Sequence, residues 1–136
     1  MFQSITNIYA QQNEPVSNIG RTKYEMRQEF PNLEYYGQDR NGEEYISRDP
    51  NGGDTSFHFV FSSNRVVKEY MKSQDSEGFS VLMYNQFCET FVDKYRWALR
   101  TNIANHKQFI FQNYTLDIIL KKENGKDIML FMYQKR

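Results

Sequence analysis

The chain has little of what most catalytic and metal sites require. Its 136 residues include one cysteine, Cys88, and two histidines, His58 and His106, so neither an intramolecular disulfide nor a thiolate zinc site can form. No His-x-His or His-Glu-x-x-His pair is present, and Gly52-Gly53 is not followed by the Lys-Ser or Lys-Thr of a phosphate-binding loop. We therefore expect no cofactor, no metal ion and no enzyme activity.

An excess of one charge and long apolar runs are also missing. Lys and Arg total 17 and Asp and Glu total 17, so the net charge at pH 7 is zero. No overall field then attracts nucleic acid or an anionic membrane. No apolar run approaches the roughly 20 residues of a membrane-spanning helix. We expect no nucleic-acid partner and no insertion into a membrane.

Aromatic residues, in contrast, are abundant. Ten Tyr and eleven Phe carry most of an aromatic share of 16%, which favours β-sheet. Phe57, Phe59 and Phe61 alternate along one segment, as the base-stacking rings of an RNA-recognition strand do. Thr55 and Ser56 replace the basic residue and the glycine of that motif, so we interpret the rings as a core strand facing the helices.

Two helices are predicted. Thr22 and Glu25 have the spacing of a capping box, and Pro31 limits the helix that follows. Residues 80–95 carry an apolar stripe at three- and four-residue spacing, which is typical of a helix packed on a sheet. Cys88 lies on that stripe, so we interpret it as a small buried side chain.

Strands follow each helix, and turn sequences separate them. Asn41-Gly42 and Asn124-Gly125 are strong hairpin signals. The predicted strands are residues 33–38, 43–48, 56–61, 66–72, 96–100, 107–112, 114–122 and 126–134.

This order predicts an α+β fold built from two tandem helix-plus-antiparallel-sheet units of about four strands each, with the helices packed on one sheet face. The units are sub-repeats at about 19–73 and 78–136, within a single domain of residues 19–136.

Residues 1–18 have features of an export signal that is incomplete. Ala10 is a small residue of the kind found at a signal-peptide cleavage site, and the segment turns polar through Asn13 and Glu14. The basic start and a full apolar stretch are absent. The segment is therefore either the remnant of an export signal or a flexible N-terminus. We expect a periplasmic or secreted protein, with a cytoplasmic location as the alternative.

The segment Ile19-Gly20-Arg21-Thr22-Lys23-Tyr24-Glu25-Met26 resembles the Gly-x-Thr-x-x-Glu helix start of small exported bacterial domains. These are the beta-lactamase inhibitory protein-like domains and the small lipoprotein subunit of the outer-membrane barrel-assembly machinery. The resemblance covers about residues 19–70 and includes the Phe-x-Phe strand. It implies an exported, non-catalytic domain that binds another protein through its sheet or loops.

The leading functional hypothesis is a non-enzymatic protein-binding module. Tyr35, Tyr36 and Tyr45 are its candidate contact residues, because aromatic side chains are enriched at interfaces. One alternative is a small-ligand carrier or enzyme with an aromatic-lined pocket between a helix and a curved sheet, which would need a polar group such as His58 or Asp117 in that pocket. Another alternative is a cytoplasmic partner-binding chaperone.

Overall fold

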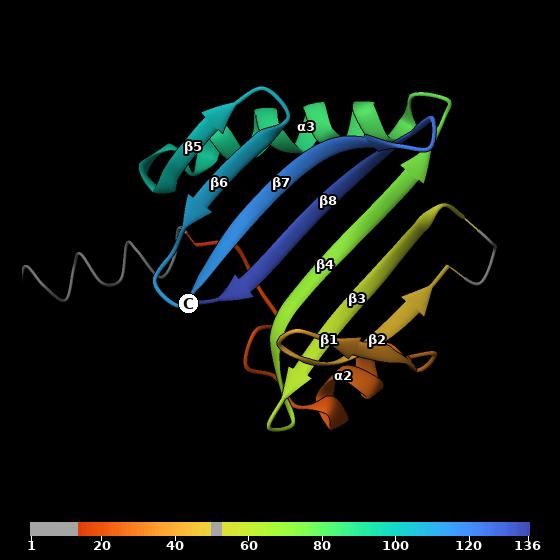
Figure 1. The fold of residues 1–136 in the computed structure, drawn as a ribbon. Coiled ribbons are helices and arrows are strands. Elements are labelled where there is room, and N and C mark those ends of the chain that lie inside the picture. The colour runs from red at the N-terminus through yellow and green to blue at the C-terminus, as the bar shows by residue number, and fades with distance from the viewer. Residues whose placement is uncertain (1–13, 50–52) are drawn as a thin grey trace, which may run out of the picture.

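A single antiparallel sheet of eight strands dominates the computed structural model, which describes residues 14–49 and 53–136 (Figure 1). The strands lie in the order β1-β2-β3-β4-β8-β7-β6-β5. Their bounds are β1 Glu34–Asp39, β2 Gly42–Arg48, β3 Thr55–Ser62, β4 Arg65–Asp75, β5 Leu99–Ile103, β6 His106–Ile110, β7 Tyr114–Glu123 and β8 Lys126–Lys135.

In the described residues, two helices cover one face of this sheet. Helix α2 (Lys23–Glu29) packs Met26 against β3, and helix α3 (Phe79–Lys94) packs Tyr84 and Cys88 over the second half. The capping box predicted at Thr22 and Glu25 is confirmed, since the Thr22 hydroxyl accepts from the Glu25 backbone N–H and the Glu25 carboxylate accepts from the Thr22 N–H. A short 3₁₀ turn, η1 (Arg96–Ala98), follows α3.

The prediction of two tandem helix-plus-sheet units is wrong. Strand β4 pairs with β8 along its length, from Lys68 opposite Gln134 to Asp75 opposite Asp127, so the strands form one continuous sheet. The physical reason is that these long strands would otherwise present unpaired backbone edges, and pairing satisfies both edges at once. The broader prediction of an α+β protein with an antiparallel sheet is confirmed.

The segment between α3 and β6 also differs from the prediction. We expected a strand over residues 96–100, but residues 96–98 continue the helical path, and the Ala98 N–H donates to the Tyr95 carbonyl at 2.9 Å. Ala98 is fully buried there. Strand β5 begins only at Leu99, because the chain first has to turn back from the end of α3 toward the sheet.

The core has two parts, both on the helix side of the sheet. The larger lies beneath α3 and contains Phe109 and Phe111, and the smaller lies beneath α2. Phe59 and Phe61 are 3% exposed within the smaller part, as the core interpretation of the Phe-x-Phe segment predicts. Phe57 is 38% exposed, because neither helix covers its end of β3.

Residues 14–20 form a strap that joins both halves of the sheet. Glu14 accepts a hydrogen bond from the Gln112 backbone N–H, and the Asn18 N–H donates to the Glu69 carboxylate at 3.2 Å. The Gly20 N–H then donates to the Val66 carbonyl at 2.8 Å. The remainder of the predicted N-terminal segment, residues 1–13 with Ala10, lies outside the described residues.

Candidate functional site

Within residues 14–49 and 53–136, no helix covers the sheet face that points away from α2 and α3, and we call this face the open face. Alternation along β3 places Ser56, His58 and Val60 on this face, opposite to the core phenylalanines. Directly opposed residues of neighbouring strands share a face. Ile46, His58 and Tyr70 therefore form one row across β2, β3 and β4.

The open face is concave at its β1 edge. Strand β1 is three strand spacings from β4, about 14 Å in a flat sheet. Lys68 of β4 nevertheless pairs with Asp39 of β1 at 3.5 Å, and the Tyr36 ring of β1 meets His58 of β3 with ring centroids 5.7 Å apart. The β1–β2 hairpin accordingly curls over this face (Figure 1).

A buried hydrogen-bonded network lies at the centre of the concave part. His58 Nδ1 lies 2.8 Å from Glu44 Oε2, and the Tyr70 hydroxyl donates to the same oxygen at 2.9 Å. The other ring nitrogen, Nε2, lies 2.8 Å from the Ser56 hydroxyl. With the Nδ1 proton on the Glu44 side, Nε2 is the acceptor and Ser56 donates to it.

Aromatic rings enclose the His58 imidazole on two sides. Tyr70 stacks on it at 4.3 Å with the planes 7° apart, and Tyr36 meets it edge-on. His58 is only 4% exposed. Burial lowers the pKa of His58 below its usual range, because the charged imidazolium would lose hydration. Burial and the hydrogen bond to Glu44 raise the pKa of Tyr70, so its hydroxyl stays a donor.

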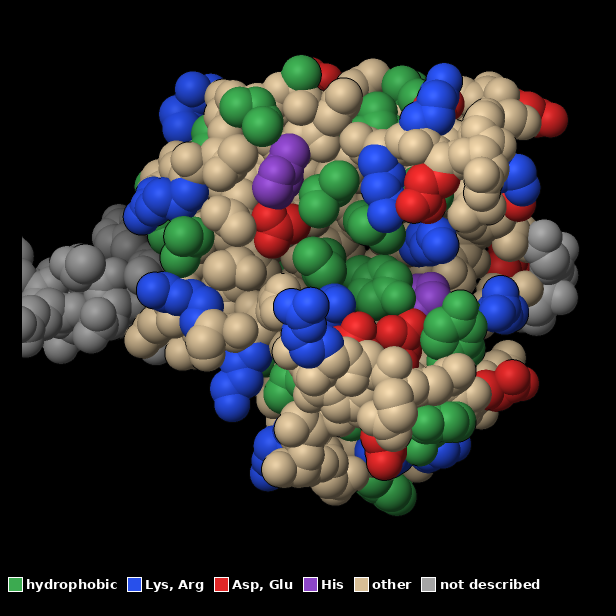
Figure 2. All heavy atoms as spheres, in the orientation of Figure 1, with side chains coloured by type: hydrophobic (Ala, Val, Ile, Leu, Met, Phe, Trp, Pro, Cys, Tyr) green, Lys and Arg blue, Asp and Glu red, His purple; other side chains and the backbone are tan. Residues whose placement is uncertain are grey.

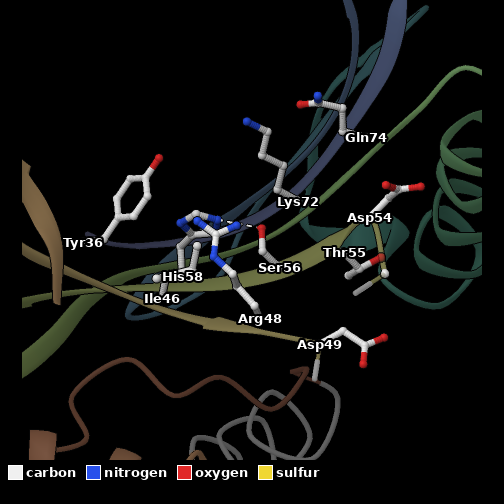
Figure 3. Close-up of a pocket in the computed structure, with 11 residues that line it drawn as sticks. Tyr36, Ile46, Arg48, Asp49, Asp54, Thr55, Ser56, His58, Lys72 and Gln74 are labelled. Atoms are coloured by element: carbon white, nitrogen blue, oxygen red, sulfur yellow. Dashed lines mark hydrogen bonds between the residues drawn. The ribbon is translucent and has the colours of Figure 1, made fainter. Parts of the chain in front are cut away.

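Beside this network the open face has a hollow of about 390 Å³ (Figure 3). Arg48, Ser56 and Lys72 lie directly opposite one another on β2, β3 and β4 and form its middle row. Asp49 and Asp54 lie at the far end, where Figure 3 shows their carboxylates turned away from the two basic groups. The hollow is therefore polar, with its cations grouped in one row.

A second histidine–carboxylate pair lies elsewhere on the open face. His106 Nε2 of β6 is 2.7 Å from Asp117 Oδ1 of β7. Figure 2 shows both histidine side chains on the side of the molecule turned to the viewer. Asp117, which the ligand-carrier alternative placed in a pocket between helix and sheet, instead holds His106 on the face away from the helices.

The three candidate tyrosines do not form one patch. Tyr36 is 58% exposed and lies at the rim of the open face beside His58. Tyr35 and Tyr45 point to the helix side, where their rings are in edge contact at 5.5 Å and Tyr45 packs on Phe61. Only Tyr36 therefore belongs to the open face.

A different hollow, of about 280 Å³, lies on the helix side between α2 and α3. Its lining is mainly aromatic and includes Phe30, Phe57, Phe87 and Phe131. Glu69 is the buried carboxylate in this lining, and burial raises its pKa. The aromatic-lined hollow of the ligand-carrier alternative thus exists, but it holds Glu69 and neither His58 nor Asp117.

The order Glu44–His58–Ser56 matches the hydrogen-bond order of a nucleophilic triad, but its setting is poor for acyl transfer. Such chemistry also needs backbone N–H donors aimed at a developing oxyanion. Ser56 lies in a strand paired on both sides, so the backbone N–H groups around it serve the sheet. The arrangement is therefore better suited to binding a partner than to stabilising an oxyanion.

Sequence reasoning singled out His58 but missed its partners Glu44, Ser56 and Tyr70. The Ser56-x-His58 spacing does place two polar side chains on one face of a strand. Nothing local indicates that Glu44 and Tyr70 come from the flanking strands in matching register. The lengths of the hairpins and the bulge at Val60 and Phe61 set the register of the strands, and this register brings the side chains into contact.

Comparisons of the chain with models of protein families, with curated proteins and with solved structures found no match. The resemblance over residues 19–70 therefore stays a prediction. Within residues 14–49 and 53–136, no helix has the length and apolar character needed to cross a membrane. Among the same residues, no group of three or more His, Cys, Asp or Glu side chains is placed to hold a metal ion.

Proposed function

We propose that the protein is a non-enzymatic protein-binding module that acts outside the cytoplasm and holds its partner on the open face. The observation that carries this proposal is the concave, uncovered sheet face with exposed Tyr36 at its rim. A partner seated there would bury tyrosine rings and meet fixed polar groups, a combination typical of protein interfaces.

The internal order of the face supports the same function. Glu44, His58 and Tyr70 are hydrogen-bonded to one another, and Tyr36 packs on the imidazole. Side chains that are already fixed lose little conformational entropy on binding. A partner therefore meets a surface whose shape is set before contact.

Photo-crosslinking in the cells that produce the protein tests this function. The residue p-benzoylphenylalanine replaces Tyr36 on the open face or, as a matched control, Tyr24, which is 72% exposed on α2. We expect a discrete protein adduct from position 36, recovered in the envelope fraction, and none from position 24. An equal yield from both positions, or no adduct from position 36, would contradict binding at this face. An adduct found only in the cytosol would favour the chaperone alternative.

The hollow between α2 and α3 supports a second candidate function, the binding of a small apolar ligand. Its aromatic lining around Glu69 suits a molecule with an apolar ring and a hydrogen-bond donor or positive charge. The neutral fluorophore N-phenyl-1-naphthylamine tests it. We expect fluorescence enhancement that Phe57→Trp reduces by filling the hollow and that Phe79→Trp, at an exposed position outside it, leaves unchanged. No enhancement in the unaltered protein would remove this candidate.

A further inference from the structure

We propose that the hollow on the open face is a carboxylate-binding site in which Arg48 and Lys72 receive an acidic side chain or the C-terminal carboxylate of the partner protein. The inference rests on the proposed function and names the chemistry of the partner at one point of the face. Three features of the hollow carry it: the row geometry, the lack of an ion pair to either basic group in the described residues, and the position of the acidic residues.

The row geometry places two long basic side chains on either side of a small one. Arg48 and Lys72 are the direct cross-strand partners of Ser56. Their Cα atoms are therefore about 10 Å apart, two strand spacings, a distance that both side chains can close toward a shared ligand. Ser56 fills little of the space between them, and its hydroxyl is turned toward His58 at 2.8 Å. The gap is open to an anion (Figure 3).

In the described part of the protein, neither cation forms an ion pair with a carboxylate. The ion pairs found within residues 14–49 and 53–136 occupy Lys68 on the same strand as Lys72, but neither Arg48 nor Lys72 takes part in one. Lys72 is also half-buried. A half-buried ammonium without a paired carboxylate has lost hydration that an incoming anion would replace.

His58 adds no competing charge of its own. Its Nε2 accepts from Ser56, and burial, with a smaller effect of the adjacent cations, lowers its pKa and favours the neutral ring. The charged side chains nearest the gap are then Arg48 and Lys72, with Asp49 and Asp54 at the far end of the hollow.

A singly charged group fits the hollow better than a phosphate dianion. Asp49 and Asp54 line its far end and offset part of the positive charge of Arg48 and Lys72, which limits the negative charge that the hollow can neutralise. Arg48 presents a planar fork of donors that matches a carboxylate in two parallel hydrogen bonds. Since the proposed partner is a protein, its aspartate and glutamate side chains and its C-terminal carboxylate are the sources of such a group.

The first experiment measures anion binding by the isolated protein, independently of any partner. Backbone amide NMR shifts of Ser56 and Lys72 are followed during titration with sodium acetate, at ionic strength held constant with sodium chloride. We expect saturable shifts that weaken roughly tenfold in Lys72→Ala and in Arg48→Ala, and that persist in the control Arg100→Ala on β5. Equal shifts with chloride alone, or shifts that survive both substitutions, overturn the site. Tighter binding of inorganic phosphate than of acetate overturns the preference for a carboxylate.

The second experiment tests the partner and separates the two proposals. Charge reversal by Lys72→Glu is combined with the crosslinker at position 36, and Arg100→Glu serves as the control. Loss of the adduct in Lys72→Glu alone supports an acidic group of the partner in this hollow. An adduct that persists there overturns the inference while the proposed function stands. If the unaltered protein gives no adduct, the proposed function fails, and the acetate titration decides the carboxylate site by itself.

Discussion

His58 is a buried base surrounded by fixed hydrogen-bond partners and aromatic rings. Its imidazole contacts the Glu44 carboxylate, the Ser56 hydroxyl and the rings of Tyr36 and Tyr70. With the ring neutral, Nδ1 donates to Glu44 and Nε2 accepts from Ser56. Protonation of this side chain places a charge in a buried environment and therefore costs free energy in the folded state.

Stability should consequently depend on pH through His58. Because burial lowers its pKa in the folded state below the usual 6.5, the unfolded polypeptide binds the proton first as the pH falls. The contribution of His58 to the free energy of unfolding is then fully present above about pH 6.5. It decreases as the pH falls through the lower, folded-state pKa.

Urea denaturation between about pH 8 and pH 5 measures this dependence. We expect the decrease to be smaller in His58→Gln and unchanged in His106→Gln, which keeps His58. A decrease of the same size in both variants would mean that another group is responsible.

A side chain at Gly42, in the β1–β2 turn, should destabilise the protein. A Cβ atom there would lie 2.1 Å from the Phe61 carbonyl oxygen, a backbone atom that cannot move aside. Gly37 has the same φ of 156° but open space around its missing Cβ, which makes it a matched control. We expect Gly42→Ala to destabilise the protein by about 1–3 kcal/mol and Gly37→Ala by clearly less, as measured by denaturant unfolding. Equal losses of stability in the two variants would show that the backbone conformation, and not the contact with Phe61, causes the loss.

At the scale of elements, α3 begins without a cap of its own. Gly78 occupies the N-cap position and offers no side chain. Asp75, at the end of β4, instead accepts hydrogen bonds from the backbone N–H groups of Glu77, Phe79 and Ser80. The end of a strand therefore holds the start of the helix, which fixes α3 relative to the sheet.

Removing this cap should weaken the protein in a pH-dependent way. Several hydrogen bonds lower the pKa of Asp75 from 3.8 to about 2, and those from Ser80 have the largest effect. The contribution of Asp75 is thus present above about pH 4 and is lost as the pH falls toward 2.

Thermal unfolding followed by circular dichroism tests the cap. We expect Asp75→Ala to have a lower midpoint than the unaltered protein at pH 7, and the difference to shrink toward pH 2. Glu77→Ala, at the neighbouring exposed position, should have little effect. A constant difference at all pH values would contradict the role of the ionised carboxylate.

The elements themselves could be predicted well, because the signals for them are local. The capping box at Thr22, the Asn124-Gly125 turn and the alternation around Phe59 depend on a few adjacent residues. The pairing of β4 with β8 could not be predicted in the same way. The local sequence does not indicate which long strands will pair, because that choice depends on the edges left free by the rest of the fold.

The site was less predictable than the fold, for a related reason. His58 could be recognised as a polar residue on a strand, but Glu44 and Tyr70 become its partners only through cross-strand register. The curl of the β1 edge, which places Tyr36 beside His58 and leaves Tyr35 on the other side, depends on the bulge at Tyr35 and Gly37.

At the scale of the whole molecule, the continuous sheet should make the two cores unfold together. Phe59 lies in the smaller core beneath α2, whereas Trp97, the single tryptophan, contacts Phe111 in the larger core. We expect Phe59→Ala, which removes a buried ring at a cost of about 3–5 kcal/mol, to shift the denaturation midpoint reported by Trp97 fluorescence. The midpoint from far-ultraviolet circular dichroism should shift equally. An unmoved Trp97 transition would indicate two independent units.

The pairing of β4 with β8 also has a consequence for synthesis. Strand β4 is complete at Asp75, but its neighbour β8 begins only at Lys126. On the ribosome, the edge of β4 that pairs with β8 therefore stays unpaired until α3, β5, β6, β7 and β8 have been made. During that interval the nascent polypeptide has an unsatisfied strand edge. Premature association through this edge is the failure that we expect when synthesis is slow or the protein is truncated before β8.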